Sequence, residues 1–204
     1  MPSHRQPCSR VRVALLIAGS ALATIPFATQ HASAAESVTR FGSTRAQDCF
    51  HAADAHRPSR EGIATCDAAL SEDLLSKADR AATLVNRGIL RVLQKDNEGA
   101  LADYAAGLAL VPDLADAYVN RGMVYVRVSG KEALAIEEIN KGLSFGSRDE
   151  SVALFGRALA YEALGRVTDA YHDYKRAAEL KPQWDAPKKE LARFTVRGPA
   201  PQAE

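Results

Sequence analysis

Small and large apolar residues recur in this chain at a fixed interval of 35 positions. Each register has an alanine, then a large residue four positions later, a small residue three further on, and a proline or serine five after that. The residues in this register are Ala100, Tyr104, Gly107 and Pro112, then Ala135, Ile139, Gly142 and Ser147, then Ala170, Tyr174, Ala177 and Pro182. Repetition at such an interval is typical of a solenoid, in which each unit buries its apolar face only against a neighbour.

Within each unit the apolar residues follow helical spacing of three or four positions. In the first unit Leu84 and Gly88 share one helical face, and Tyr104 and Leu108 share another beyond a polar turn at 95–97. The two later units repeat this arrangement, so each unit is predicted to be two helices joined by a short turn. No run alternates apolar and polar residues as a strand does, and the predicted fold class is all-α.

The repeated pattern resembles the tetratricopeptide repeat at several offsets together. The first helices read Leu84-x-x-Arg87-Gly88, Tyr118-x-x-Arg121-Gly122 and Leu154-x-x-Arg157-Ala158. The resemblance implies a right-handed solenoid of three such units, plus a degenerate first hairpin and a C-terminal capping helix. The expected domain covers 47–196, with hairpins at about 47–73, 81–114, 115–149 and 151–184, a capping helix at about 185–196, a flexible lead at 35–46 and a disordered tail at 197–204.

Small residues in both helices of each unit predict a close approach of the two backbones. The first helices have a notch at Gly88, Gly122 and Ala158, which Tyr104, Ile139 and Tyr174 are expected to fill. An arginine precedes each notch and an acid precedes each filling residue, which predicts an ion pair in every hairpin: Arg87 with Asp103, Arg121 with Glu138, and Arg157 with Asp173. We interpret these acids as structural rather than catalytic, with a small energy for each pair if it is exposed.

The N-terminal segment has the pattern of a cleavable secretory signal. Three arginines and no acid precede an apolar run at 13–23, and small residues at 32–34 follow it. We expect cleavage after Ala34, so that 1–34 is a signal peptide and the mature chain is periplasmic or secreted. The apolar run is shorter than the roughly 20 residues that a spanning helix needs, so no membrane insertion is expected after cleavage.

Charge excludes one class of partner. The full chain has 26 basic and 25 acidic residues and a net charge of +1. Cleavage removes three arginines and no acid, which leaves 23 basic residues against 25 acidic ones and a net charge of −2. This balance gives no electrostatic footprint for nucleic acid, and none is expected as a partner.

Cys49 and Cys66 remain after cleavage and flank the turn at Arg57-Pro58. An antiparallel hairpin places them opposite each other, which in an exported protein predicts a disulfide. A zinc site that also uses His51 and His56 is the alternative. Their spacing matches no standard pair of metal ligands, so we expect neither a metal nor another cofactor.

Residues not needed for packing indicate a binding groove. Asn86 and Asn120 occupy the same place in successive units. In the tetratricopeptide family the first helices line a concave groove, and asparagines at this place hydrogen-bond the backbone of an extended peptide. The resemblance also implies an apolar floor, formed by Ile89, Met123, Val126, Phe155 and Leu159.

No motif of a hydrolase, a P-loop enzyme or a dinucleotide enzyme is present, so the chain is not expected to be an enzyme. We expect a protein–protein interaction module or scaffold of the cell envelope that binds a peptide or protein segment in the groove. A structural assembly subunit of an envelope complex is the alternative. The basic clamp that reads C-terminal carboxylates in chaperone-binding relatives is not evident, with Arg127 alone near such a place.

Overall fold

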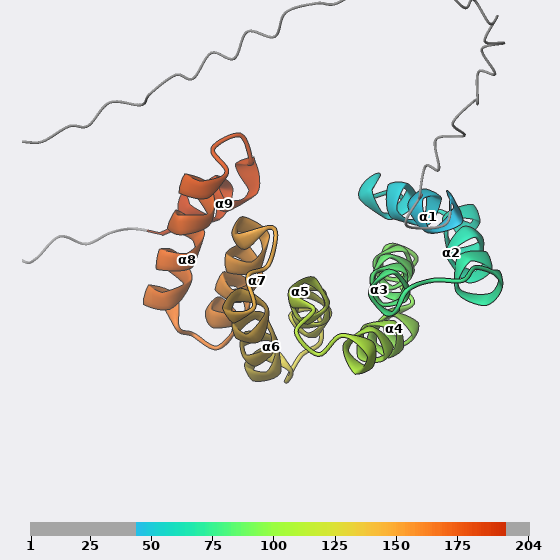
Figure 1. The fold of residues 1–204 in the computed structure, drawn as a ribbon. Helices are drawn as coiled ribbons and strands as arrows, with labels where there is room; N and C mark the ends of the chain where they lie inside the picture. The colour runs from blue at the N-terminus through green and yellow to red at the C-terminus, as the bar shows by residue number, and fades with distance from the viewer. Residues whose placement is uncertain (1–43, 195–204) are drawn as a thin grey trace, which may run out of the picture. The chain divides into compact units, whose positions relative to one another are not determined.

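The computed structural model describes residues 44–194, and this part of the chain forms nine helices and no strand (Figure 1). All of them belong to the second of two compact units, residues 39–204. The helices are α1 (Thr44–Asp54), α2 (Arg60–Glu72), α3 (Lys77–Leu93), α4 (Asn97–Leu110), α5 (Ala115–Tyr125), α6 (Glu132–Ser144), α7 (Glu150–Ala163), α8 (Val167–Leu180) and α9 (Asp185–Leu191). The predicted signal peptide and tail, and most of the predicted lead, lie outside the described residues.

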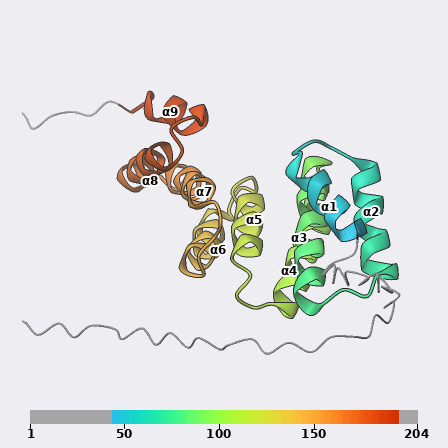
Figure 2. The same cartoon turned by 45° about the horizontal axis from the view of Figure 1, so that its top comes forward.

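The helices pack in chain order as a row of hairpins (Figures 1 and 2). Each odd-numbered helix from α1 to α7 packs on the helix that follows it, and α9 packs on α8. The odd-numbered helices also contact one another in sequence, α1 with α3, α3 with α5 and α5 with α7. The prediction of an all-α helical repeat is therefore confirmed.

Local residues explain where the helices begin and end. The Ser76 side chain accepts a hydrogen bond from the Asp79 N–H at the start of α3, and Asp96 caps α4 in the same way. Lys95 and Gly165 close the turns within two hairpins with positive φ angles of 67° and 73°. Gly165 adopts this conformation without the steric penalty that a side chain brings.

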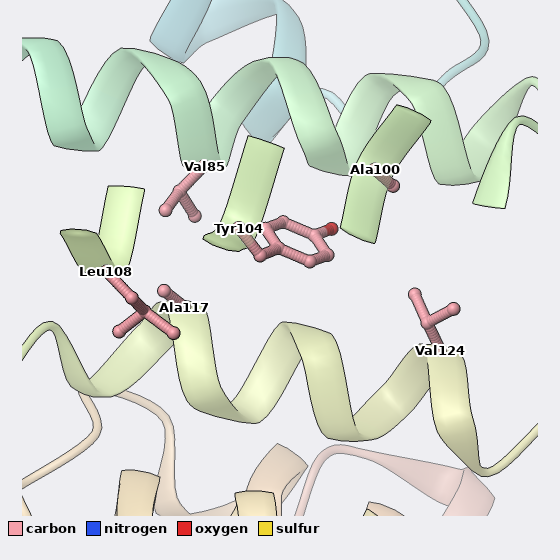
Figure 3. Close-up of a cluster of buried hydrophobic side chains, with 6 residues drawn as sticks. All are labelled: Val85, Ala100, Tyr104, Leu108, Ala117 and Val124. Atoms are coloured by element: carbon pink, nitrogen blue, oxygen red, sulfur yellow. The ribbon is translucent and has the colours of Figure 1, made fainter. Parts of the chain in front are cut away.

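The predicted packing between small and large residues is confirmed. Tyr104, Ile139 and Tyr174 are buried, and so are the alanines of their register. A Cβ added to Gly88 would lie 2.5 Å from Cε1 of Tyr104, so glycine is needed for this contact. Figure 3 shows the Tyr104 ring between α3 and α5, where it joins one hairpin to the next.

A disulfide occupies the corresponding place in the first hairpin. Cys49 of α1 and Cys66 of α2 are joined with an S–S distance of 2.10 Å, and both are buried. They are 17 residues apart in sequence, the same separation as Gly122 and Ile139. Within α1 only Cys49 and Ala53 are buried, so the disulfide is a principal attachment of this helix.

Three helix ends lie a few residues away from the expected boundaries. Helix α1 begins at Thr44, inside the predicted lead, because Arg45 pairs with Glu72 and Asp73 at the end of α2. Helix α3 begins at Lys77 rather than 81, because Ser76 caps it. Helix α9 ends at Leu191 because the chain tightens there, and Phe194 donates its N–H to the carbonyl of Leu191.

The hydrophobic length needed to cross a bilayer is not reached by any helix within residues 44–194.

Candidate binding groove

A hollow of about 310 Å³ runs along the odd-numbered helices. Its walls come from α1, α3, α5, the start of α7 and the turn that precedes α7. The lining residues are Phe50, Ala53, Asp54, His56, Val85, Ile89, Asp116, Val119, Asn120, Ser147, Arg148, Asp149 and Val152. We call this surface the groove.

The groove crosses the helices obliquely. In α1 the lining residues lie in the second half of the helix, whereas in α3 they lie near its middle at Val85 and Ile89. In α5 they lie in its first half, and in α7 the lining is reduced to Val152 in the first turn. This drift towards the N-terminus of each successive helix is what a small rotation between stacked units produces.

The floor of the groove is apolar and mainly aliphatic. It consists of Ala53, Val85, Ile89, Val119 and Val152, with Phe50 at one edge. Val85 and Val119 also belong to the buried clusters between hairpins, so the packing of the stack holds this floor in place. A rigid apolar floor favours a ligand with apolar side chains because binding removes them from water.

The two predicted asparagines differ, because Asn86 is not among the residues that line the groove. Asn120 lines the groove, and its Nδ2 donates a hydrogen bond to the carbonyl of Asp116 at 2.8 Å. That bond leaves the Oδ1 atom of Asn120 free to accept from a ligand. Asn86 is half-buried next to Val85 and forms no side-chain hydrogen bond with the described residues.

The predicted floor residues divide into two sets. Ile89 lines the groove together with Asn120. Met123 and Val126 pack instead against the cluster that joins α5, α6 and α7, and Phe155 and Leu159 pack against the one around Tyr174. The third equivalent of the two asparagines is Gly156, where an added Cβ would lie 2.2 Å from Sδ of Met123. Met123 therefore occupies the space that a third asparagine would need.

The contributions of α1 and of the turn before α7 were not predicted from the sequence. Phe50, Ala53 and Val152 line the groove, although no repeated register pointed to them. Their place follows from the oblique course of the groove, which uses a different turn of each helix. The alternating order of the predicted helices gave a usable signal for α1, since it is the first helix of its hairpin.

Charged groups in the groove are mostly bonded within the protein. Asp116 accepts hydrogen bonds from Nε and the backbone N–H of Arg148 at 2.5 and 3.2 Å, and from Oγ of Ser147. Asp149 accepts hydrogen bonds from Lys181 at 2.9 Å, from Oγ of Ser151 and from the N–H of Val152. Partial burial raises the pKa of Asp149, but these hydrogen bonds outweigh it and hold the pKa below its ordinary value.

The predicted ion pairs are present in all three units, but they are not exposed. Arg87 pairs with Asp103, Arg121 with Glu138 and Arg157 with Asp173. The three acids are only 3%, 8% and 7% exposed, so the small energy expected for exposed pairs does not apply. Their partners lie on the adjoining helix of the same hairpin, and none of these acids lines the groove. The interpretation of these acids as structural is consistent with that placement.

No group of three or more histidine, cysteine, aspartate or glutamate side chains in residues 44–194 is arranged to hold a metal ion. The two cysteines that a zinc site would need are joined to each other.

Comparisons with known proteins place this geometry in context. Residues 151–184 match the family model of the tetratricopeptide repeat. No curated protein matches the chain in a sequence search. Several solved structures are similar in fold.

One similar structure is the first tetratricopeptide domain of Spaghetti (RPAP3) bound to the HSP90 peptide SRMEEVD. The two sequences are 27% identical, and the match covers 57% of this chain and 93% of the RPAP3 chain, with a TM-score of 0.53. The NMR structure of the first such domain of human RPAP3 is also 27% identical, with coverages of 55% and 87% and a TM-score of 0.51. The crystal structure of MamA protein, at 22% identity, coverages of 75% and 79% and a TM-score of 0.50, shows likeness of fold.

Proposed function

Because this chain is a tetratricopeptide-repeat protein, we propose that it is a non-catalytic interaction module that binds an extended segment of a partner polypeptide in its groove. The observation that carries this proposal is the continuous groove along α1, α3, α5 and α7. A surface that combines an apolar floor with the free Oδ1 acceptor of Asn120 suits a polypeptide, whose backbone N–H groups need acceptors. The RPAP3 domain, which binds a peptide, supports this reading.

We further propose that the protein acts in the cell envelope. The basic, apolar and small-residue pattern of residues 1–34 supports export, and the Cys49–Cys66 disulfide suits an oxidising compartment. Mass spectrometry of the protein isolated from its own cells tests this proposal. A mature N-terminus at Ala35 is expected, and an intact N-terminus in the cytoplasmic fraction would contradict export.

The groove proposal is tested by removing together the amides of Asn120, which lines the groove, and of Asn86, which follows the lining residue Val85. Asn86→Ala with Asn120→Ala is expected to abolish retention of the partner in affinity purification with crosslinking, while circular dichroism stays unchanged. The matched control is Gln94→Ala with Asn97→Ala, because neither of these amide side chains lines the groove or forms a side-chain hydrogen bond with the described residues. Equal retention by both double variants would show that the groove is not the binding site.

A second role, as an assembly subunit that joins larger envelope proteins, is favoured by one observation. Large apolar side chains are exposed away from the groove, among them Leu134, Phe145 and Val167. A stoichiometric complex that survives the Asn86 and Asn120 substitutions, but not Phe145→Ser, would support this role over binding in the groove.

A further inference from the structure

The charges in the groove bear on which segment it binds. Three carboxylates line it, those of Asp54, Asp116 and Asp149, against one guanidinium, that of Arg148. Arg148 already donates from Nε to Asp116, and Lys181 already donates to Asp149. A ligand carboxylate would therefore find no lysine or arginine at the groove that is not shared with a carboxylate of the protein, and His56 is the one lining imidazole.

Because Arg148 is exposed, an ion pair with it would contribute little to the affinity for an acidic ligand. The side chain of Arg148 is 78% exposed, so its remaining N–H groups face solvent. Arg127 is exposed as well, and it does not line the groove. An acidic segment would also approach the carboxylates of Asp54 and Asp116 and be repelled by them.

The uncharged residues that line the groove favour an apolar ligand. Ala53, Val85, Ile89, Val119 and Val152 form an aliphatic floor without an unpaired buried charge. Oδ1 of Asn120 remains available for a backbone N–H of a ligand, and the amide of Asn86, which follows the lining residue Val85, forms no hydrogen bond with the described residues. These groups satisfy a peptide backbone irrespective of side-chain identity, so the aliphatic floor is left to select the side chains.

We propose that the groove selects an uncharged, aliphatic internal segment of a partner polypeptide and discriminates against acidic C-terminal segments. This inference rests on the proposed function and deepens it. It gives this groove a specificity opposite in charge to the HSP90 peptide SRMEEVD that the similar RPAP3 domain binds. Because the recognition is apolar, binding should depend little on ionic strength.

The test uses the purified full chain and two decapeptide libraries. The neutral library is acetylated and amidated, and its positions vary over Val, Ile, Leu, Ala, Ser and Asn. The acidic library has two glutamates and a free C-terminus, and SRMEEVD serves as a defined acidic probe. We expect the best neutral peptides to bind at least about tenfold more tightly than any acidic peptide, and to change by less than about twofold when salt is raised.

A pair of valine variants locates the binding. Val152→Glu places a carboxylate in the floor, whereas Val167→Glu places one outside the groove, where Val167 is 54% exposed. Both positions lie in the first turn of a helix, where glutamate is favourable, so both variants should fold. Val152→Glu should weaken the binding of the neutral peptide about tenfold, and Val167→Glu should leave it unchanged.

The possible failures have different meanings. If SRMEEVD binds as tightly as the neutral peptides and Arg148→Ala weakens it, the charge inference is overturned and the proposed function stands. If neither library binds, or if both valine variants behave alike, the groove is not a peptide site and both proposals are overturned.

Discussion

Arg157 donates two hydrogen bonds to the buried carboxylate of Asp173, from Nε at 2.7 Å and from Nη2 at 2.8 Å. A third bond runs from its Nη1 to Oδ1 of Asn140 at 2.6 Å, so that one side chain links α6, α7 and α8. Hydrogen bonding to Asp173 raises the pKa of Arg157 above its ordinary value, although burial opposes the shift. The guanidinium therefore holds together two hairpins as well as the two helices of its own hairpin.

We predict that Arg157→Leu is more destabilising than Arg87→Leu. Loss of Arg157 leaves Asp173 buried without its cation, which costs about 3–5 kcal/mol of unfolding free energy. Loss of Arg87 leaves Asp103 with a second cation, because Nη1 of Arg91 lies 2.9 Å from it. Urea unfolding monitored by circular dichroism measures both values, and equal losses would contradict the assignment.

Arg121, the arginine of the middle hairpin, forms no such bond with the described residues of the preceding hairpin. Asp67 and Asn140 follow Cys66 and Ile139 and bond to the arginine of the next hairpin. Ala105 occupies the corresponding place after Tyr104, so Arg121 bonds only to Glu138 among the described residues.

Ala105→Asp should supply the missing carboxylate. The control is Ala106→Asp, which is exposed on the same helix and carries the same loss of helix propensity. We expect the Ala105 variant to be more stable than the control by about 0.5–1 kcal/mol in low salt. A control variant of equal or greater stability would show that Arg121 does not reach across the hairpins.

Gly122 packs closely against Ile139, so a side chain at Gly122 should be destabilising. A Cβ on Gly122 would lie 2.6 Å from Cγ1 of Ile139 and 3.1 Å from the carbonyl oxygen of Ala135. Gly122→Leu should therefore lower the unfolding free energy by about 1–3 kcal/mol or more, as should Ala170→Phe. Because Ile139→Ala removes the Cγ1 atom, the loss in Gly122→Ala with Ile139→Ala should be smaller than the sum of the two single losses. Thermal unfolding unchanged from the wild type would show that the helices do not approach so closely.

Much of this arrangement could be predicted from the sequence because it repeats. The register of Ala100, Ala135 and Ala170 identified the hairpins, their notches and the filling residues, since one physical requirement, close packing, recurs at each place. The course of the groove could not be predicted in this way. The rotation between units moves the lining from the second half of α1 to the first turn of α7, so a fixed offset identified Ile89 and Asn120 but not Phe50 or Val152.

The burial of the paired acids could not be predicted from the sequence either. The pairing of Arg157 with Asp173 followed from the pattern, whereas the near-complete burial of the acid depends on how neighbouring hairpins cover it. The pattern likewise placed Cys49 and Cys66 opposite each other, but only the packing shows that they take the places of the glycine notch and of the residue that fills it.

Removal of the disulfide should loosen α1 before the rest of the stack. The Cys49–Cys66 bond closes a loop of 17 residues, and its loss is worth about 3 kcal/mol on the chain-entropy model. In Cys49→Ala with Cys66→Ala, amide hydrogen exchange should accelerate strongly in α1 and little in α7. Uniform acceleration, or none, would contradict the view that this bond is a principal attachment of α1.

Acid should weaken the contact between Asp149 and Lys181. Because the folded-state pKa of Asp149 is lowered, its stabilising effect is present above the pKa of the unfolded chain and is lost as pH falls through the folded value. The unfolding free energy of the wild type should therefore fall more between about pH 5 and pH 3 than that of Asp149→Asn. Parallel pH profiles for the two proteins would show that this carboxylate contributes nothing.

The four asparagines of the chain allow the most direct test of the central claim that the groove binds a polypeptide segment. Asn120 lines the groove and Asn86 follows the lining residue Val85, whereas Asn97 begins α4 and Asn140 bonds to Arg157. Their side-chain NH₂ signals can be followed by ¹⁵N NMR while a neutral aliphatic decapeptide is titrated into the labelled protein. Binding in the groove predicts saturable shifts for Asn86 and Asn120 with Asn97 and Asn140 unmoved. Shifts confined to Asn97 and Asn140, or none at all, would contradict binding in the groove.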